Sequence, residues 1–119
     1  MNYYLPEDFQ GCAYVFYNVE NEPTLTLKDG VIDYHFNEDG ILLTSSPPDF
    51  GWEGKDSSRF HQVNYYSGDR LMDIEEITFN SLGEGYVYDV GKYYFEKIGV
   101  KEEYCRHISG VARRIFQNQ

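Results

Sequence analysis

The stretch of sequence that decides the fold is Leu25-Thr26-Leu27-Lys28-Asp29-Gly30-Val31-Ile32-Asp33-Tyr34-His35-Phe36. Apolar and polar residues alternate on both sides of Asp29-Gly30, and an Asp-Gly pair between two such segments is a strong signal of a β-hairpin. In the second strand, the residues expected to face the core are Ile32, Tyr34 and Phe36, and those expected to face away are Asp33 and His35. The sequence therefore predicts a hairpin over 25–36.

Short strands separated by turn residues are expected along most of the chain, which is typical of an antiparallel β domain. The further strands are predicted at 12–17, 41–44, 60–66, 71–79, 86–90 and 93–98. Cys12–Tyr17 is apolar at both parities, which favours a central strand covered on both faces. The two hairpin strands and the strand at 41–44 are expected to form a meander.

Within 71–79 the apolar residues change from one face of the expected strand to the other near Glu75-Glu76. Either a β-bulge or a short helix is therefore expected there.

Beyond Lys101 the apolar period changes from two residues to about 3.6, which predicts an amphipathic helix from near Lys101 to near Phe116. The apolar stripe of this helix consists of Tyr104, Ile108, Val111, Ala112, Ile115 and Phe116. We therefore predict a mainly β or α+β fold, a single domain over 1–119 with strands over roughly 12–98 and one C-terminal helix over roughly 101–116. Its antiparallel sheet, of about six to eight strands, is expected to form a sandwich or a partly open barrel.

The charge of the chain is divided between an acidic body and a basic tail. Residues 1–91 carry 17 Asp and Glu against 4 Lys and Arg, a net of −13, whereas residues 92–119 carry 3 against 6, a net of +3. The overall charge of −10 disfavours binding to nucleic acid or to an anionic membrane, because both require clustered Lys and Arg. A basic protein is the partner that this charge favours. The oligomeric state is not predicted.

The start of the chain and its hydropathy predict a cytoplasmic protein. No run approaches the about 18 apolar residues of a membrane span, and the first residues lack the basic segment of a secretory signal. If a leader was removed, a periplasmic or surface location is expected instead. Cys12 and Cys105 are too few and too far apart in sequence to indicate a disulfide framework or a zinc site, so we expect buried free thiols.

No catalytic motif is assembled in the sequence, and we predict that the protein is not an enzyme. The three histidines are isolated from any nucleophile or base at a recognisable spacing. Asp33 and His35 share one strand face and could supply two metal ligands, but polar pairs on strands usually face water. We therefore predict no catalytic residue, no metal and no cofactor.

Two groups of residues are candidates for contact with a partner. The acidic cluster contains Asp69, Asp73, Glu75 and Glu76, and the Pro- and Gly-rich loop before it contains Asp49, Trp52 and Glu53. Carboxylates grouped in this way attract Lys and Arg of another protein, and an exposed Trp beside carboxylates is a plausible anchor in an interface. The alternatives are that the carboxylates only face solvent and that the Trp ring caps the core.

Several turn and core motifs are shared with a known family. They are Leu5-Pro6-Glu7-Asp8-Phe9 with Gly11, the apolar strand through Tyr17, Asp39-Gly40-Ile41-Leu42 with Thr44-Ser45-Ser46, and Gly51-Trp52. Over Tyr4–Trp52 the chain resembles an uncharacterised family, a domain of unknown function, of small bacterial β-rich proteins. Many members of that family are secreted or lipid-anchored. The resemblance implies a fold and a bacterial origin, and it brings no catalytic residues.

The sequence leaves two function classes open. The first hypothesis is a non-enzymatic immunity-type inhibitor that covers the active site of a basic toxin or effector, favoured by the small acidic chain without catalytic motifs. The alternative is a cell-surface or periplasmic β-module in which tyrosines and Trp52 bind a sugar or a peptide, favoured by the family resemblance. The gene next to this one and the presence of a signal sequence would separate the two hypotheses.

Overall fold

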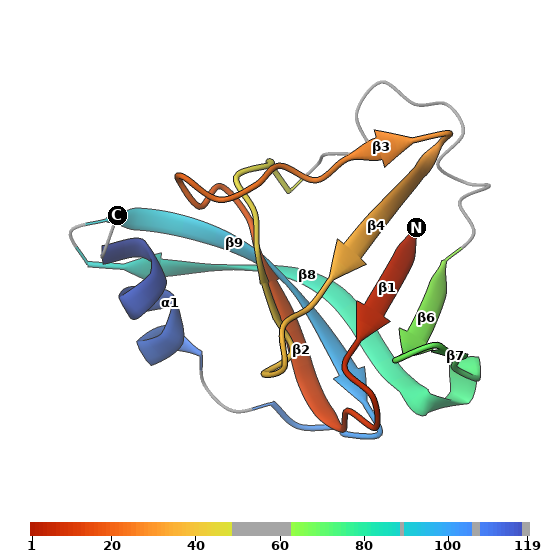
Figure 1. Cartoon of the computed structure of the whole chain (residues 1–119). Coiled ribbons are helices and arrows are strands. Elements are labelled where there is room, and N and C mark those ends of the chain that lie inside the picture. Colours follow the sequence, from red (N-terminus) through yellow and green to blue (C-terminus); the bar gives the residue numbers. More distant parts are fainter. Residues whose placement is uncertain (49–62, 89, 106–107, 118–119) are drawn as a thin grey trace.

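The structure, a computed structural model, describes residues 1–48, 63–88, 90–105 and 108–117 (Figure 1). Within these residues the strands form a five-stranded sheet of order β3-β4-β1-β6-β7 and a four-stranded sheet of order β5-β2-β9-β8. The strands are β1 (Asn2–Leu5), β2 (Gly11–Phe16), β3 (Leu27–Lys28), β4 (Val31–His35), β5 (Ile41–Leu43), β6 (Asn64–Ser67), β7 (Arg70–Leu71), β8 (Ile77–Val87) and β9 (Gly91–Val100). A 3₁₀-helix spans Ile74–Glu76, and the C-terminal helix α1 spans Ser109–Gln117.

The hairpin predicted around Asp29-Gly30 is confirmed. Strands β3 and β4 pair antiparallel, with Leu27 opposite Ile32. Both turn residues have positive φ, 53° for Asp29 and 79° for Gly30, which is the combination that a two-residue type I′ turn requires. Ile32 and Tyr34 are buried, and His35 on the opposite parity is exposed, as the alternation predicted.

The predicted meander is wrong, and so is the prediction of a purely antiparallel domain. Strand β4 pairs in parallel with β1, which lies before the region 12–98 where strands are predicted. Strand β5 belongs to the other sheet, where it pairs in parallel with β2. A tight turn redirects the chain between them, because the Asn37 side chain accepts hydrogen bonds from the Asp39 and Ile41 amides and Gly40 adopts a φ of 76°. The two sheets are therefore mixed, and neither closes into a barrel.

The change of apolar parity within 71–79 is explained by a short helix, one of the two predicted alternatives. The 3₁₀-helix ends at Glu76, and β8 begins at the next residue with a register shift between Ile77 and Phe79. Strand β8 then pairs with β9 as far as the turn that joins them.

Two hydrophobic cores lie on the two faces of the four-stranded sheet. The first lies between the sheets and is built mainly by β1, β2, β4 and β9; the second lies between the four-stranded sheet and α1, where Ala112 and Phe116 are buried. The helix begins later than predicted. Lys101 has a φ of 54°, residues 101–105 are not helical, and Tyr104 is 83% exposed, so its predicted packing against the sheet is wrong.

Candidate binding face

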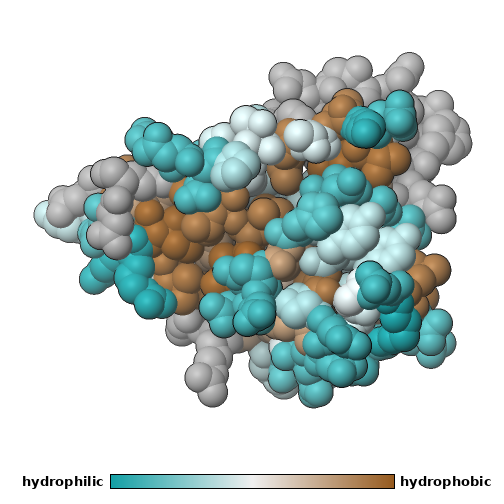
Figure 2. All heavy atoms as spheres, viewed as in Figure 1, coloured by the Kyte–Doolittle hydropathy of each residue, from teal (hydrophilic) through white to brown (hydrophobic). Residues whose placement is uncertain are grey.

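The outer face of the five-stranded sheet carries two rows of side chains across three neighbouring strands. Strand β1 lies between β4 and β6 and is parallel to both, so equivalent residues stand side by side instead of being staggered. Asn2 stands beside Asp33 and Asn64, and Tyr4 stands beside His35 and Tyr66. We call these six residues the binding face. Figure 2 shows hydrophilic and intermediate side chains over β1, β4 and β6, whereas hydrophobic side chains gather around α1.

The first row of the binding face consists of stacked rings. The Tyr4 ring lies 4.6 Å from the His35 ring and 5.0 Å from the Tyr66 ring, at interplanar angles of 7° and 13°. These separations match the about 4.7–4.9 Å between neighbouring strands, so the sheet itself sets the stack. Because the rings cover one another's faces, they present their edges and polar atoms outward. The result is a rigid row of phenol and imidazole groups.

The second row is a chain of hydrogen bonds between polar side chains. The Asn64 amide Nδ2 donates to Asn2 Oδ1 at 3.1 Å, and Asn2 Nδ2 donates to Asp33 Oδ1, also at 3.1 Å. The row is therefore held in place from strand to strand by its own hydrogen bonds. Asn2, Asp33 and Asn64 are all half-buried.

The electrostatics of the binding face keep the Tyr4 phenol protonated. Loss of hydration raises the pKa of Tyr4, and the nearby Asp33 carboxylate and Tyr66 phenol raise that pKa further, because each disfavours a phenolate. At neutral pH the Tyr4 hydroxyl is thus both a donor and an acceptor. The binding face combines amide, phenol, imidazole and carboxylate groups on three neighbouring strands, and its six residues include no Lys or Arg.

Buried hydrogen bonds on the inner side of β1 hold the binding face in place. The Tyr3 hydroxyl donates to Glu96 Oε2 at 2.5 Å, and the Tyr17 hydroxyl donates to Glu96 Oε1 at 2.7 Å. Burial first, and then the Glu96 carboxylate, raise the pKa values of both tyrosines, so they remain donors. The Tyr3 ring also stacks on Tyr34 and Tyr65, at 4.4 and 5.0 Å. The position of β1 is therefore fixed by hydrogen bonds to the opposite sheet and by ring stacking.

A hollow of about 400 Å³ lies where β1 and β6 end. It is lined by Glu7, Ser67, Gly68, Asp69 and Arg70. Ser67 is buried, and its hydroxyl accepts a hydrogen bond from the Asp8 amide at 2.8 Å, which ties the β1–β2 loop to β6. One of the predicted contact residues, Asp69, thus lines a recess where β1 and β6 end.

The predicted acidic cluster separates into one structural carboxylate and three exposed ones. Glu76 accepts two hydrogen bonds from Arg70, both at 3.1 Å, lies 3.4 Å from Lys101 Nζ and accepts a hydrogen bond from the Asp73 amide. The Arg70 hydrogen bonds, followed by the one from the Asp73 backbone, lower the pKa of Glu76 to about 2. Asp69, Asp73 and Glu75 are exposed. The predicted contact residues Asp49, Trp52 and Glu53 lie outside the described residues.

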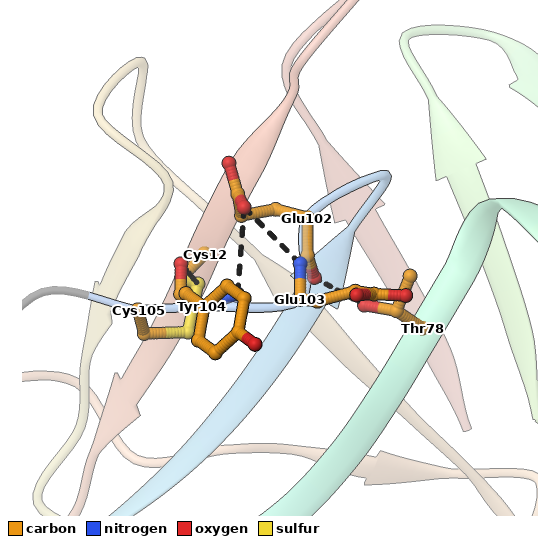
Figure 3. The surroundings of a disulfide bond; sticks show 6 residues. All are labelled: Cys12, Thr78, Glu102, Glu103, Tyr104 and Cys105. Carbon is orange, nitrogen blue, oxygen red and sulfur yellow. Dashed lines mark hydrogen bonds between the residues drawn. A yellow bond between two sulfur atoms is a disulfide. The ribbon is translucent and has the colours of Figure 1, made fainter.

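The prediction of free thiols is wrong, because Cys12 and Cys105 form a disulfide with a Cα–Cα distance of 5.8 Å (Figure 3). It links β2 to the segment before α1 across a sequence separation of 93. Near the bridge, the Glu102 side chain accepts hydrogen bonds from the Glu103 and Tyr104 amides, and its carbonyl accepts one from the Thr78 hydroxyl. The chain between β9 and α1 is thus attached to both β2 and β8. Disulfides persist mainly in oxidising compartments.

Comparison with known proteins identifies the family. The model of DUF6843, a family of unknown function, matches residues 1–108. The chain belongs to this family. That result confirms the resemblance to an uncharacterised bacterial family which the motifs indicated. A crystal structure of a protein described as a putative lipoprotein from Bacillus anthracis is similar, with a TM-score of 0.62 and 26% identity over 91% of this chain and 74% of that one. No curated protein matches the chain.

In this DUF6843 member, the binding face was missed at the sequence level because β1 was not predicted. One signal was present, since the triplet Asn-Tyr-Tyr occurs at both 2–4 and 64–66. The structure places these two copies side by side in register. The two possible metal ligands Asp33 and His35 lie on this face, and the described residues contain no group of three or more His, Cys, Asp or Glu placed to hold an ion. None of the described helices is long and apolar enough to cross a membrane.

Proposed function

We propose that this protein is an extracytoplasmic binding module that holds a polyhydroxylated ligand, a glycan chain of the cell surface, on the binding face. The observation that carries the proposal is the in-register pair of rows on β4, β1 and β6, with carboxamides and a carboxylate in one and stacked rings in the other. The proposal develops the second of the two sequence hypotheses.

Two independent observations support a location outside the cytoplasm. The Cys12–Cys105 disulfide is a bond that reducing compartments do not maintain. The similar crystal structure is of a protein described as a putative lipoprotein, a class that is exported and anchored to a membrane by lipid. Together they favour the periplasmic or surface location over the cytoplasmic one that the start of the chain predicted.

The chemistry of the binding face suits sugar hydroxyls. Each sugar hydroxyl both donates and accepts a hydrogen bond, so it needs acceptors and donors nearby. Asn and Tyr side chains supply both, and Asp supplies acceptors. Along each row the contacts repeat at the strand spacing, which presents a regular line of partners to an extended ligand. The rows are fixed before binding by their own stacking and hydrogen bonds. Less side-chain entropy is therefore lost when a ligand orders them.

The test is a calorimetric titration of the oxidised protein with solubilised bacterial cell-wall glycan and with soluble chitin and β-glucan oligosaccharides. We expect one class to bind, and we expect Asn2→Ala and Tyr4→Ala to weaken that binding by about tenfold or more each. Tyr104→Ala is the matched control, because Tyr104 is 83% exposed in the segment between β9 and α1. Absence of binding to every glycan, or equal binding by all four proteins, would overturn the proposal.

The immunity-type function is kept as a second candidate because Asp69, Asp73 and Glu75 are exposed and the chain has a net charge of −10. Through these carboxylates the protein would dock a basic toxin or effector domain. Reversing Asp69 and Glu75 to Lys would then slow association and flatten its salt dependence, since exposed charges act mainly on the encounter rate. Binding kinetics with the product of a neighbouring gene, at two salt concentrations, test this candidate. Unchanged rates in the double variant would reject it.

A further inference from the structure

Strand β8 has an open edge. It lies last in the four-stranded sheet, spans 11 residues and pairs with β9 on one side, and no other strand of the described residues adjoins it. In an antiparallel pair, every second residue directs its backbone N–H and C=O away from the neighbouring strand. The outer edge of β8 therefore carries a row of donors and acceptors that match those of another strand.

The residues of this edge do not protect it from pairing. Natural edge strands are usually blocked by Lys, Pro or a covering segment, and β8 contains neither Lys nor Pro. Its one charged residue, Glu84, lies 3.7 Å from Lys92 of the neighbouring strand. Leu82 is 59% exposed and Tyr86 is 72% exposed on the same face. Both side chains are therefore available to a strand added at this edge.

The sequence of the edge is symmetric about Glu84. It reads Leu82-Gly83-Glu84-Gly85-Tyr86, with a large apolar residue at each end and a glycine on each side of the centre. Two copies placed antiparallel with a two-fold axis at Glu84 pair Leu82 with the partner's Tyr86. They also pair Gly83 with the partner's Gly85. Within these five residues, each apolar side chain meets an apolar side chain, and the glycines meet each other.

The structure explains why both glycines are present. The rings of Phe95 and Tyr93 lie over Gly83 and Gly85, so that an added Cβ would come within 2.6 and 2.3 Å of ring atoms. Aromatic rings of the neighbouring strand thus cover these positions from within the same chain, in the way that edge glycines are stabilised. At these two positions β8 itself presents no side chain on this face.

We propose that two copies of the chain associate through β8, antiparallel and with the two-fold axis at Glu84, so that the two four-stranded sheets become one continuous sheet. Charge fits this arrangement. The two central carboxylates repel each other, but each has its own Lys92 beside it, so the four charges at the junction sum to zero. The net charge of −10 on each copy opposes association, so added salt should strengthen the dimer.

The first test is sedimentation velocity of the oxidised protein at concentrations up to about 1 mM, the weak end of specific association. Wild type is expected to dimerise, and Leu82→Lys is expected to raise the dissociation constant by about tenfold or more. Leu71→Lys is the matched control, because Leu71 is 58% exposed on β7, the edge strand of the other sheet, and the substitution adds the same charge. Wild-type protein that stays monomeric at every concentration, or an equal rise of the dissociation constant in both variants, would overturn the proposal.

The second test checks the register. At the two-fold axis, paired residues have Cβ atoms about 4.5–5.5 Å apart, so a Glu84→Cys variant should form an intermolecular disulfide under mild oxidation. Glu38→Cys removes the same charge at an exposed turn residue and serves as the control. We expect the Glu84→Cys protein to cross-link at least about tenfold faster. Equal rates would reject the symmetric register even if the protein dimerises.

Discussion

The two sheets of the molecule differ in what covers them. The four-stranded sheet has a hydrophobic core on each face, one shared with the five-stranded sheet and one shared with α1. The five-stranded sheet contributes to the first core alone, and its outer face carries the ring and amide rows. A sheet that is buried on both faces contributes stability. A sheet that is buried on one face has positions free for recognition, because their side chains are not needed for the core.

The largest loss of stability is expected from a substitution where α1 covers the four-stranded sheet. Phe116 is buried beside Phe16 and Tyr93, so Phe116→Ala removes a whole ring from the second core. We expect a loss of about 3–5 kcal/mol in the free energy of unfolding, measured by urea titration. Tyr88→Ala, at a residue that is 73% exposed, is the control and should change that value by less than about 0.5 kcal/mol. A small loss for Phe116→Ala would mean that α1 is peripheral.

The next largest effect is expected from the disulfide. Replacing Cys12 and Cys105 by Ser frees the segment before α1 from β2 and should lower the free energy of unfolding by about 2–5 kcal/mol. Urea titration of the double variant and of the reduced wild type should give similar losses. If reduction leaves stability unchanged, the bridge does not hold α1 to the sheet.

A smaller, pH-dependent effect is expected at Glu76. Its pKa is lowered to about 2 in the folded protein from an ordinary value of 4.5, so its ionised form is favoured by folding. This contribution is fully present above pH 4.5 and is lost as the pH falls toward 2. Glu76→Gln should therefore destabilise the protein at pH 7, and the difference from wild type should shrink between pH 5 and 2. A difference that is constant with pH would show that the charge of Glu76 is not involved.

The parts of the fold that depend on neighbouring residues were predictable from the sequence. Asp29-Gly30 has the turn chemistry of a hairpin, and the 3.6-residue period of Ile108, Ala112 and Phe116 indicated the helix. What was missed depends on distant residues. A four-residue first strand is too short to show a period, and its parallel pairing with β4 and β6 leaves no local turn signal. The disulfide joins residues 93 positions apart, and no spacing rule predicts such a pair.

The candidate site was predicted only in part, for a related reason. Clustered carboxylates are visible in any sequence, but ion pairing is not, so Glu76 could not be separated from Asp69 and Glu75. The binding face needs three strands in register before its rows exist. The repeated Asn-Tyr-Tyr triplet at 2–4 and 64–66 was the available signal. It indicates a shared face only when the two copies are known to lie on adjacent strands.

We expect the outer face of the five-stranded sheet to recognise the ligand. Chemical-shift mapping of the ¹⁵N-labelled protein, titrated with the glycan that binds in calorimetry, tests this expectation most directly. The largest shifts are predicted at the amides of β1, β4 and β6, including Asn2, Tyr4 and Tyr66, with the amides of β8, β9 and α1 nearly unchanged. Shifts that cluster on the four-stranded sheet or α1, with the β1 amides unmoved, would contradict the account.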